Sequence, residues 1–148
     1  MDGVRLIDGP FDPWAELQRH QAERLAGEAG LGATAVFVGS MRDLNEGDAV
    51  TAMTLEHYPG MTEKHLAAIL DEARGRYTLI DALIVHRVGR ILPTDPIVLT
   101  AAWSAHRKDA FEACRFLMEA LKSRAPFWKK ETLADGGERW VEKNTPGY

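Results

Sequence analysis

Residues 79–104 read LIDALIVHRVGRILPTDPIVLTAAWS, two apolar runs on either side of a turn, and the architecture follows from them. Successive apolar positions in 79–88 are typical of a strand that is covered on both faces. The segment 92–96, LPTDP, combines two prolines with an aspartate and predicts a turn. The apolar run 97–104 follows that turn, so the sequence predicts a strong pair of strands.

The sequence on either side of this pair predicts further helices and strands. Apolar residues recur at helical spacing in three segments, and β-branched or alternating residues indicate strands in others. The turn signal at 135–137, DGG, predicts a hairpin near the end of the chain. The expected helices are 13–29, 61–74 and 107–122, and the expected strands are 32–38, 49–58, 127–132 and 138–142, with a polar loop at 39–48.

We expect one continuous domain over residues 1–148, because no linker, internal repeat or low-complexity tract interrupts the chain. The expected fold class is α+β, with helices packed against a mostly antiparallel or mixed sheet. The candidate core faces are Trp14, Leu17, Ala22 and Leu25 in the first helix and Phe111, Cys114, Leu117, Met118 and Leu121 in the third. The thiol of Cys114 is therefore expected to be buried, protonated and a poor nucleophile.

The composition is that of a soluble globular protein, with 45% apolar and 27% charged residues among 148. These values exclude disordered, fibrous and disulfide-stabilised miniprotein classes. A single cysteine excludes a disulfide framework and cysteine-clustered zinc or iron–sulfur sites, and it favours a reducing compartment. No apolar run approaches the roughly 18 residues that cross a bilayer, and no signal peptide is evident, so we expect a cytoplasmic protein without membrane contact.

Charge is distributed unevenly along the chain. The net charge is -4, yet residues 106–130 contain seven Lys or Arg and three acidic residues, a local net charge of +4. An acidic chain with one basic segment favours a small anionic ligand or an acidic partner over a long polyanion such as nucleic acid. The same charges also fit a solvated helix face, so charge alone leaves the function open.

Basic residues at the edges of the expected elements are candidates for ligand binding, since no nucleotide-binding loop, zinc-protease helix or nucleophile elbow is present. Arg42 follows a strand. His106 and Arg107 begin a helix, where backbone N–H groups and the helix dipole favour an anion such as phosphate. Arg107 offers a two-pronged donor, and His106 can exchange a proton near neutral pH. A solvated helix cap is the alternative interpretation of this pair.

Lys122 lies at the other end of the same helix, roughly four turns or about 22 Å from His106, so one phosphate need not contact both. A bipartite or subunit-spanning site accommodates them. Lys122 is followed by Arg124, Lys129 and Lys130, and a lysine crowded by like charges has its charged form disfavoured. Such a neutral amine can act in acid–base or nucleophilic chemistry. Lysines that simply complement the helix dipole are the alternative.

Several motifs between residues 31 and 142 occur in the order and spacing of one enzyme family. They are VFVGSMR at 36–42, NEG at 45–47, LEHYPGM at 55–61, HRVG at 86–89, SAHRKDAFEA at 104–113 and LKSRAPFWKKE at 121–131. With these motifs the chain resembles the large, catalytic subunit of molybdopterin synthase. Residues 1–30 match poorly and are treated as a variable N-terminal segment.

The resemblance implies a sulfurtransferase of molybdenum cofactor biosynthesis, which converts cyclic pyranopterin monophosphate (precursor Z) to molybdopterin by inserting two dithiolene sulfurs. It implies a small ubiquitin-like partner that carries the sulfur as a C-terminal thiocarboxylate, and a homodimer of large subunits within a heterotetramer. It also implies a hammerhead-like portion in the α+β fold, and neither a metal nor a cofactor. The lone Cys114, expected to be buried, agrees with an external sulfur donor.

The resemblance further implies a pocket for the pterin phosphate substrate. Its residues in this sequence are Ser40, Met41, Arg42, His106, Arg107, Lys122, Lys129, Lys130 and Glu131. Lys122 and Lys129 are the catalytic candidates, as acid–base groups or as stabilisers of the thiocarboxylate and a developing oxyanion. A pocket near the dimer interface would let Arg42 reach substrate bound mainly by the other subunit.

Two other functions stay open on the sequence alone. In the first, the basic segment holds a phosphorylated metabolite or an acidic partner without any chemistry, and no product forms. In the second, the basic residues and Trp128 form a nucleic-acid-binding module. The acidity of the whole chain disfavours that module, and a steep salt dependence of RNA or DNA binding would reveal it.

Overall fold

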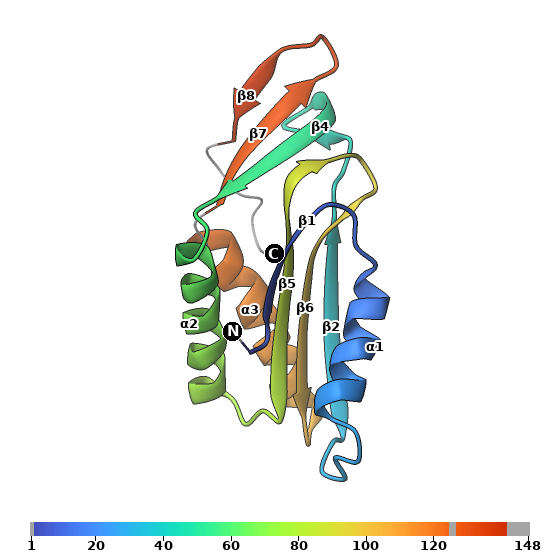
Figure 1. Cartoon of the computed structure of the whole chain (residues 1–148), viewed down its shortest axis with the longest axis vertical. Coiled ribbons are helices and arrows are strands. Elements are labelled where there is room, and N and C mark those ends of the chain that lie inside the picture. The colour runs from blue at the N-terminus through green and yellow to red at the C-terminus, as the bar shows by residue number, and fades with distance from the viewer. Residues whose placement is uncertain (1, 125–126, 142–148) are drawn as a thin grey trace.

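The computed structural model describes residues 2–124 and 127–141, in which a mixed sheet of eight strands is flanked by three helices (Figure 1). The strand order is β2-β6-β5-β4-β7-β8, with β1 beside β5 and β3 beside β4. The strands are β1 (Val4–Asp8), β2 (Ala33–Ser40), β3 (Leu44–Asn45), β4 (Asp48–His57), β5 (Asp81–Ile91), β6 (Pro96–Ser104), β7 (Phe127–Leu133) and β8 (Glu138–Trp140). The helices are α1 (Pro13–Arg24), α2 (Met61–Arg76) and α3 (Arg107–Arg124). Only β1 and β5 are parallel among the described pairs, so the predicted α+β class with a mixed sheet is confirmed.

The predicted strand pair forms the centre of the sheet. Residues 81–86 of β5 pair antiparallel with β6. In the connecting turn, the Asp95 carboxylate accepts a hydrogen bond from the Leu92 backbone N–H at 3.0 Å. The pair predicted from residues 79–104 is therefore confirmed, although β5 continues to Ile91.

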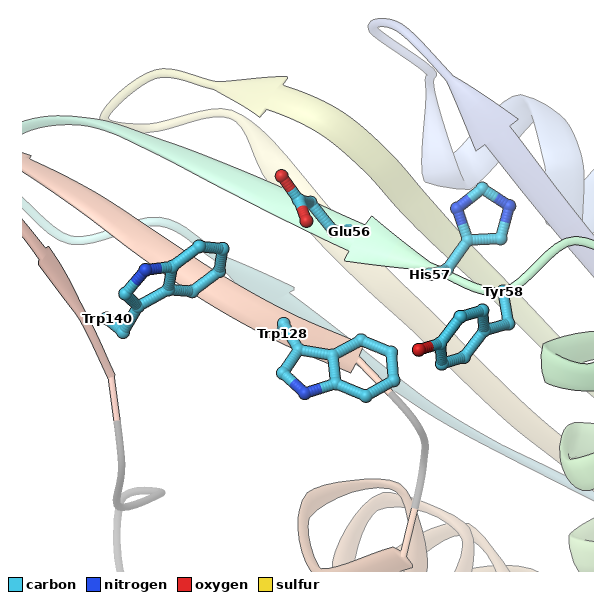
Figure 2. A pocket seen from close by; sticks show the side chains of 5 residues that line it. All are labelled: Glu56, His57, Tyr58, Trp128 and Trp140. Carbon is cyan, nitrogen blue, oxygen red and sulfur yellow. The ribbon is translucent and has the colours of Figure 1, made fainter.

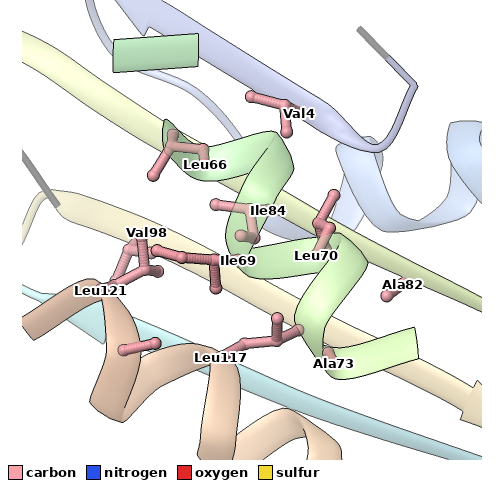
Figure 3. Close-up of a cluster of buried hydrophobic side chains, with 11 residues drawn as sticks. Val4, Leu66, Ile69, Leu70, Ala73, Ala82, Ile84, Val98, Leu117 and Leu121 are labelled. Atoms are coloured by element: carbon pink, nitrogen blue, oxygen red, sulfur yellow. The ribbon is translucent and has the colours of Figure 1, made fainter. Parts of the chain in front are cut away.

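Alternation along β5 divides the core between the two faces of the sheet. Ile84 faces α2 and α3, where it lies in one cluster with Leu70 and Leu117 (Figure 3). Its neighbour Leu83 faces α1 and belongs to a second cluster that contains Trp103. The helices α2 and α3 thus cover one face of the sheet, and α1 covers the other.

The long strand β5 changes partners at Gly89. It pairs with β1 up to Val88 and with β4 from Gly89 onward. Gly89 has a φ of 81°, a left-handed conformation that glycine adopts without strain. Beyond this point β3, β4, β7 and β8 form a smaller sheet that projects past the helices (Figure 1).

Three segments differ from the sequence prediction. No element was predicted for residues 4–8, which form β1, because pairing with the distant β5 stabilises a segment with little pattern of its own. The loop expected at 39–48 contains the end of β2 and the short strand β3. The helix expected at 13–29 ends at Arg24, and the Leu25 backbone is no longer helical.

Two aromatic residues expected in the core are exposed. Trp14 is 58% exposed and Phe111 is 67% exposed. The described helix α3 turns its buried residues Ala110 and Cys114 toward the sheet, which leaves Phe111 on the outer side. Helical periodicity locates the buried face of a helix only to within about one residue. Residues at the edge of that face are therefore easily assigned to the wrong side.

Cys114 is buried as predicted. Its side chain is 6% exposed and its sulfur lies 3.5 Å from the Thr100 hydroxyl. Burial raises the pKa of the Cys114 thiol, so the thiolate is disfavoured. Glu142, expected at the end of the closing hairpin, lies outside the described residues, as do Ala125 and Pro126 of the motif at 121–131. Within the described ranges, no helix is both long and apolar enough to span a membrane.

Candidate functional site

Lys122 and Lys129 come together where α3 ends and β7 begins. Lys122 lies in the last turn of α3, and Lys129 is the third residue of β7. Both side chains are half-buried. Burial and the neighbouring Lys122 ammonium group lower the pKa of Lys129 to about 8, although Glu131 acts in the opposite direction. The structure thus places an amine that can exchange a proton near neutral pH at this junction.

The pairing of β7 with β4 determines which way these side chains point. Lys129 is opposite the buried Leu55, and Trp128 is opposite Glu56. Neighbouring residues on a strand face opposite sides, so Lys129 faces the interior junction and Lys130 faces outward with Trp128. The Lys130 ammonium group forms an ion pair with Glu138 at 2.7 Å. Lys130 therefore does not share the face on which Lys129 lies.

Neither Lys130 nor Arg124 crowds the pair in the way that the sequence spacing suggested. The guanidinium group of Arg124 forms an ion pair with Glu72 of α2 at 2.7 Å. Lys130 is paired on the other face of β7. The like charge that lowers the pKa of Lys129 is that of Lys122.

His86 is a residue of this junction that the sequence analysis did not select. Its imidazole is buried and stacks on Phe127, with ring centroids 4.1 Å apart. Nδ1 lies 2.8 Å from the Arg87 carbonyl oxygen, which only accepts, so Nδ1 carries the hydrogen and donates. Burial, together with the charges of Lys129 and Lys122, lowers the pKa of His86 to about 4, although the hydrogen bond to the Arg87 carbonyl acts in the opposite direction. A histidine in the middle of the apolar run 79–88 was the signal available in the sequence.

Glu131 links the strands of the projecting sheet. Its carboxylate is buried, accepts a hydrogen bond from Asn45 Nδ2 at 3.0 Å and forms an ion pair with Arg139 Nε at 2.9 Å. Arg139 also forms an ion pair with Asp48 at 2.7 Å. These contacts join β3, β4, β7 and β8, so Glu131 holds in place the strand that carries Lys129.

Ser40, Met41 and Arg42 lie where β2 ends. The Met41 side chain is buried in a cluster with Val50 and Ile91. Its backbone N–H donates to the Asp95 carbonyl oxygen at 2.9 Å, which ties this segment to the β5–β6 turn. Ser40 and Arg42 are exposed on either side of Met41. The buried side chain of Met41 thus fixes the backbone that carries the exposed Arg42.

His106 and Arg107 lie at the opposite end of α3 from Lys122. Both side chains are exposed, and α3 begins at Arg107. The helix is continuous to Arg124. Within one chain its two ends are therefore roughly four turns apart, as the sequence indicated. The structure therefore brings Lys122 and Lys129 together, but it does not bring His106 or Arg107 to them within one chain.

Within residues 2–124 and 127–141, no three His, Cys, Asp or Glu side chains are grouped to hold a metal ion. The chemistry that the junction offers is that of two adjacent amines beside a neutral imidazole. Such a site suits an anionic substrate and proton exchange.

Comparison with known proteins gives the family. The model of the family described as MoaE protein matches residues 10–124. The chain belongs to the MoaE family. The family resemblance inferred from the sequence motifs is confirmed, and the match begins inside the N-terminal segment that those motifs left out.

Curated relatives of the chain share one enzyme name. A molybdopterin synthase catalytic subunit from Ralstonia nicotianae is 53% identical over 142 residues, which are 96% of this chain and 78% of that protein. One from Pseudomonas aeruginosa is 50% identical over 139 residues, which are 94% of this chain and 89% of that protein. This MoaE chain is accordingly an enzyme subunit of the sulfurtransferase type, related to molybdenum cofactor biosynthesis.

Solved structures agree on the fold. The molybdopterin biosynthesis MoaE protein from Burkholderia ambifaria superposes with a TM-score of 0.79 at 50% identity, covering 99% of this chain and 93% of that one. Molybdopterin synthase from Staphylococcus aureus superposes with a TM-score of 0.83 at 32% identity, covering 95% of this chain and 98% of that one. The whole described architecture, including the projecting sheet, is therefore that of the family.

Proposed function

We propose that this MoaE chain inserts the two dithiolene sulfurs that convert cyclic pyranopterin monophosphate to molybdopterin. The sulfur would come from the thiocarboxylated C-terminus of a small ubiquitin-like subunit. The observation that carries the proposal is the junction of Lys122 and Lys129, where burial and a neighbouring ammonium group lower the pKa of Lys129 to about 8. Family membership supplies the reaction class.

The two lysines suit a thiocarboxylate donor. A thiocarboxylate is an anion, and two ammonium groups in a half-buried site attract it more strongly than they would in water. When its carbonyl carbon is attacked, negative charge develops on oxygen, and a nearby ammonium group stabilises that charge. An amine with a pKa near 8 can also give up its proton and take it back at neutral pH.

The sulfur source lies outside this chain. Cys114 is the only cysteine, it is buried, and burial raises the pKa of its thiol. A protonated thiol on the buried side of α3 is a poor nucleophile. This supports a separate protein as the sulfur donor.

The exposed basic residues at the first turn of α3 act across a subunit boundary. In the proposed homodimer, His106 and Arg107 of one subunit, together with Ser40 and Arg42, hold the pterin phosphate beside the lysine pair of the other. The first turn of α3 supplies unpaired N–H groups for that phosphate. Two such subunits with two small subunits form the proposed cytoplasmic heterotetramer. Buried Met41 and Glu131 position this pocket, whereas Lys130 lies on the other face of β7, paired with Glu138.

The test is molybdopterin formation from cyclic pyranopterin monophosphate by the purified protein. Three mixtures are compared: the thiocarboxylated small subunit, the same subunit with an ordinary C-terminal carboxylate, and no small subunit. Product is expected in the first mixture alone. Absence of product with a donor that serves another synthase would contradict the proposal and would favour a protein that only binds a phosphorylated metabolite or an acidic partner.

A further inference from the structure

The outward face of the projecting sheet carries a group of exposed aromatic side chains. Tyr58 is 56% exposed, Trp128 is 43% exposed and Trp140 is 51% exposed. With Glu56 and His57 they line a hollow of about 300 Å³ (Figure 2). Tyr58, Trp128, Trp140 and Glu56 are called the aromatic face below. Exposed patches of aromatic side chains are enriched at binding surfaces.

Strand pairing explains how residues distant in the sequence meet on this face. Glu56 of β4 is opposite Trp128 of β7, and Lys130 of β7 is opposite Trp140 of β8. The Tyr58 ring meets the Trp128 ring edge to face, with centroids 4.8 Å apart at an angle of 86°. In Figure 2, Trp128 lies between Trp140 and Tyr58. The aromatic face is thus built on paired strands, which hold its rings in place.

The face already holds one cation. The Lys130 ammonium group lies 5.8 Å from the centroid of the Trp140 ring and forms an ion pair with Glu138 at 2.7 Å. Glu56 lies close enough to stabilise the charge of Lys130 as well. The described charges here are thus two carboxylates and one ammonium group. The net negative charge and the electron-rich ring faces both attract a further cation.

We propose that the aromatic face binds the guanidinium group of an arginine side chain presented by a protein partner. A planar guanidinium stacks on an indole ring, and its paired N–H groups fit the Glu56 carboxylate. The small sheet leaves this position open to solvent, because the indole of Trp128 and the ring of Tyr58 remain half exposed. The site lies on the opposite face of β7 from Lys129, so the inference does not depend on the proposed sulfur transfer.

The experiment is an NMR titration of the indole N–H signals of the full chain. The probes are N-acetyl-arginine amide and its neutral counterpart N-acetyl-citrulline amide, which differ in the charged group alone. Trp→Phe variants at 14, 128 and 140 assign the signals. The signals of Trp128 and Trp140 are expected to move with the arginine probe, and at least about threefold less affinity is expected for citrulline. The signal of Trp14, exposed on α1, is expected to stay in place.

Equal responses to both probes, or equal movement of the Trp14 signal, would overturn the inference. Tighter binding of N-acetyl-lysine amide than of the arginine probe would also overturn it, because a compact ammonium would then be the ligand. If Trp128→Ala dissociates the protein in sedimentation experiments, the face is an interface between two copies of this chain, and the inference is wrong.

Substitutions test the individual groups. Trp128→Ala and Glu56→Gln are each expected to weaken arginine binding by about threefold to tenfold. Trp14→Ala is the matched control, since it removes an exposed indole elsewhere and is expected to change nothing. Trp128→Phe keeps a ring and is expected to retain part of the affinity. Unchanged binding in Trp128→Ala or Glu56→Gln, with circular dichroism showing a folded chain, would refute the assignment.

Discussion

The two ends of α3 carry basic residues in opposite surroundings. At the first turn, His106 and Arg107 are exposed. At the last turn, Lys122 lies half-buried against Lys129, whose pKa falls to about 8. Solvent screens an exposed charge, whereas burial beside a like charge changes the proton affinity of an amine. Basic residues at the two ends of one helix therefore have different surroundings, and it is packing that lowers the pKa of Lys129.

The difference also assigns the two ends to different tasks. An exposed arginine at a helix N-terminus suits the binding of a phosphate, which needs charge and donors but no proton exchange. A half-buried amine with a lowered pKa suits a group that touches the reacting atoms. Because α3 is one continuous helix, the two tasks meet only if two subunits share a site.

The largest expected effect is at the buried end. Lys129→Ala and Lys122→Ala are each expected to reduce the rate of molybdopterin formation by about 100-fold or more, because they remove the charge beside the transferring sulfur. Lys129→Arg keeps a charge but cannot exchange a proton, so its rate separates acid–base from electrostatic action. The measurement is single-turnover product formation with saturating thiocarboxylated donor.

Lys64, an exposed lysine of α2, supplies the matched control for these variants. Lys64→Ala is expected to retain the rate of the unmodified protein. A Lys129→Ala protein that keeps turnover within about threefold of normal would remove the chemical distinction between the two ends of α3.

A smaller effect is expected on stability in acid, and it comes from His86 at the same buried end. Its pKa is about 4 in the folded chain against 6.5 for the ordinary group, so the unfolded chain binds more protons between these pH values. Stability from this group is therefore present above pH 6.5 and is lost as the pH falls toward 4. The free energy of unfolding is expected to fall by at most about 3 kcal/mol, and urea unfolding at each pH measures it.

The comparison with exposed histidines sharpens this prediction. The quantity compared is the slope of the free energy of unfolding against pH. His86→Gln is expected to remove most of this slope between pH 6.5 and 4, while His65→Gln, at an exposed position of α2, leaves the slope unchanged. Equal slopes in the His86→Gln variant and the unmodified protein would show that the imidazole is not held neutral by its surroundings.

The smallest expected signal comes from mixing subunits. Arg107→Ala and Lys122→Ala homodimers are each expected to be nearly inactive, because each lacks one part of every site. If sites span two subunits, unfolding and refolding the two variants together restores up to about a quarter of the normal rate, because half of the dimers are mixed and each has one intact site. Restoration is followed by product formation against the separate variants. If the refolded mixture recovers no activity, the two ends of α3 belong to separate sites.

Much of the fold could be predicted from the sequence, because long elements carry their own periodicity. The β5–β6 pair, α2 and α3 each have a strong local pattern. β1 does not, since its five residues become a strand only by pairing with β5, which follows more than 70 positions later. Phe111 shows the complementary error, in which a correct helix has one residue assigned to the wrong side.

The candidate lysines could be named from the sequence, whereas the surroundings that lower the pKa of Lys129 could not. The motifs in the sequence point to Lys122 and Lys129, yet the lowered pKa of Lys129 depends on β7 pairing with β4 and on the end of α3 lying against it. His86 enters the junction for the same reason, through its stacking on Phe127. Burial of this kind is set by tertiary packing, so a charge pattern along the chain does not reveal it.

The most direct measurement is the titration of the Lys129 amine by NMR, with Lys129→Arg used to assign its signal. A midpoint near pH 8 is expected, and Lys122→Met is expected to move it upward by removing the neighbouring charge. A midpoint at the ordinary value of 10.5, unchanged by Lys122→Met, would contradict the claim that burial at the α3–β7 junction creates the reactive amine.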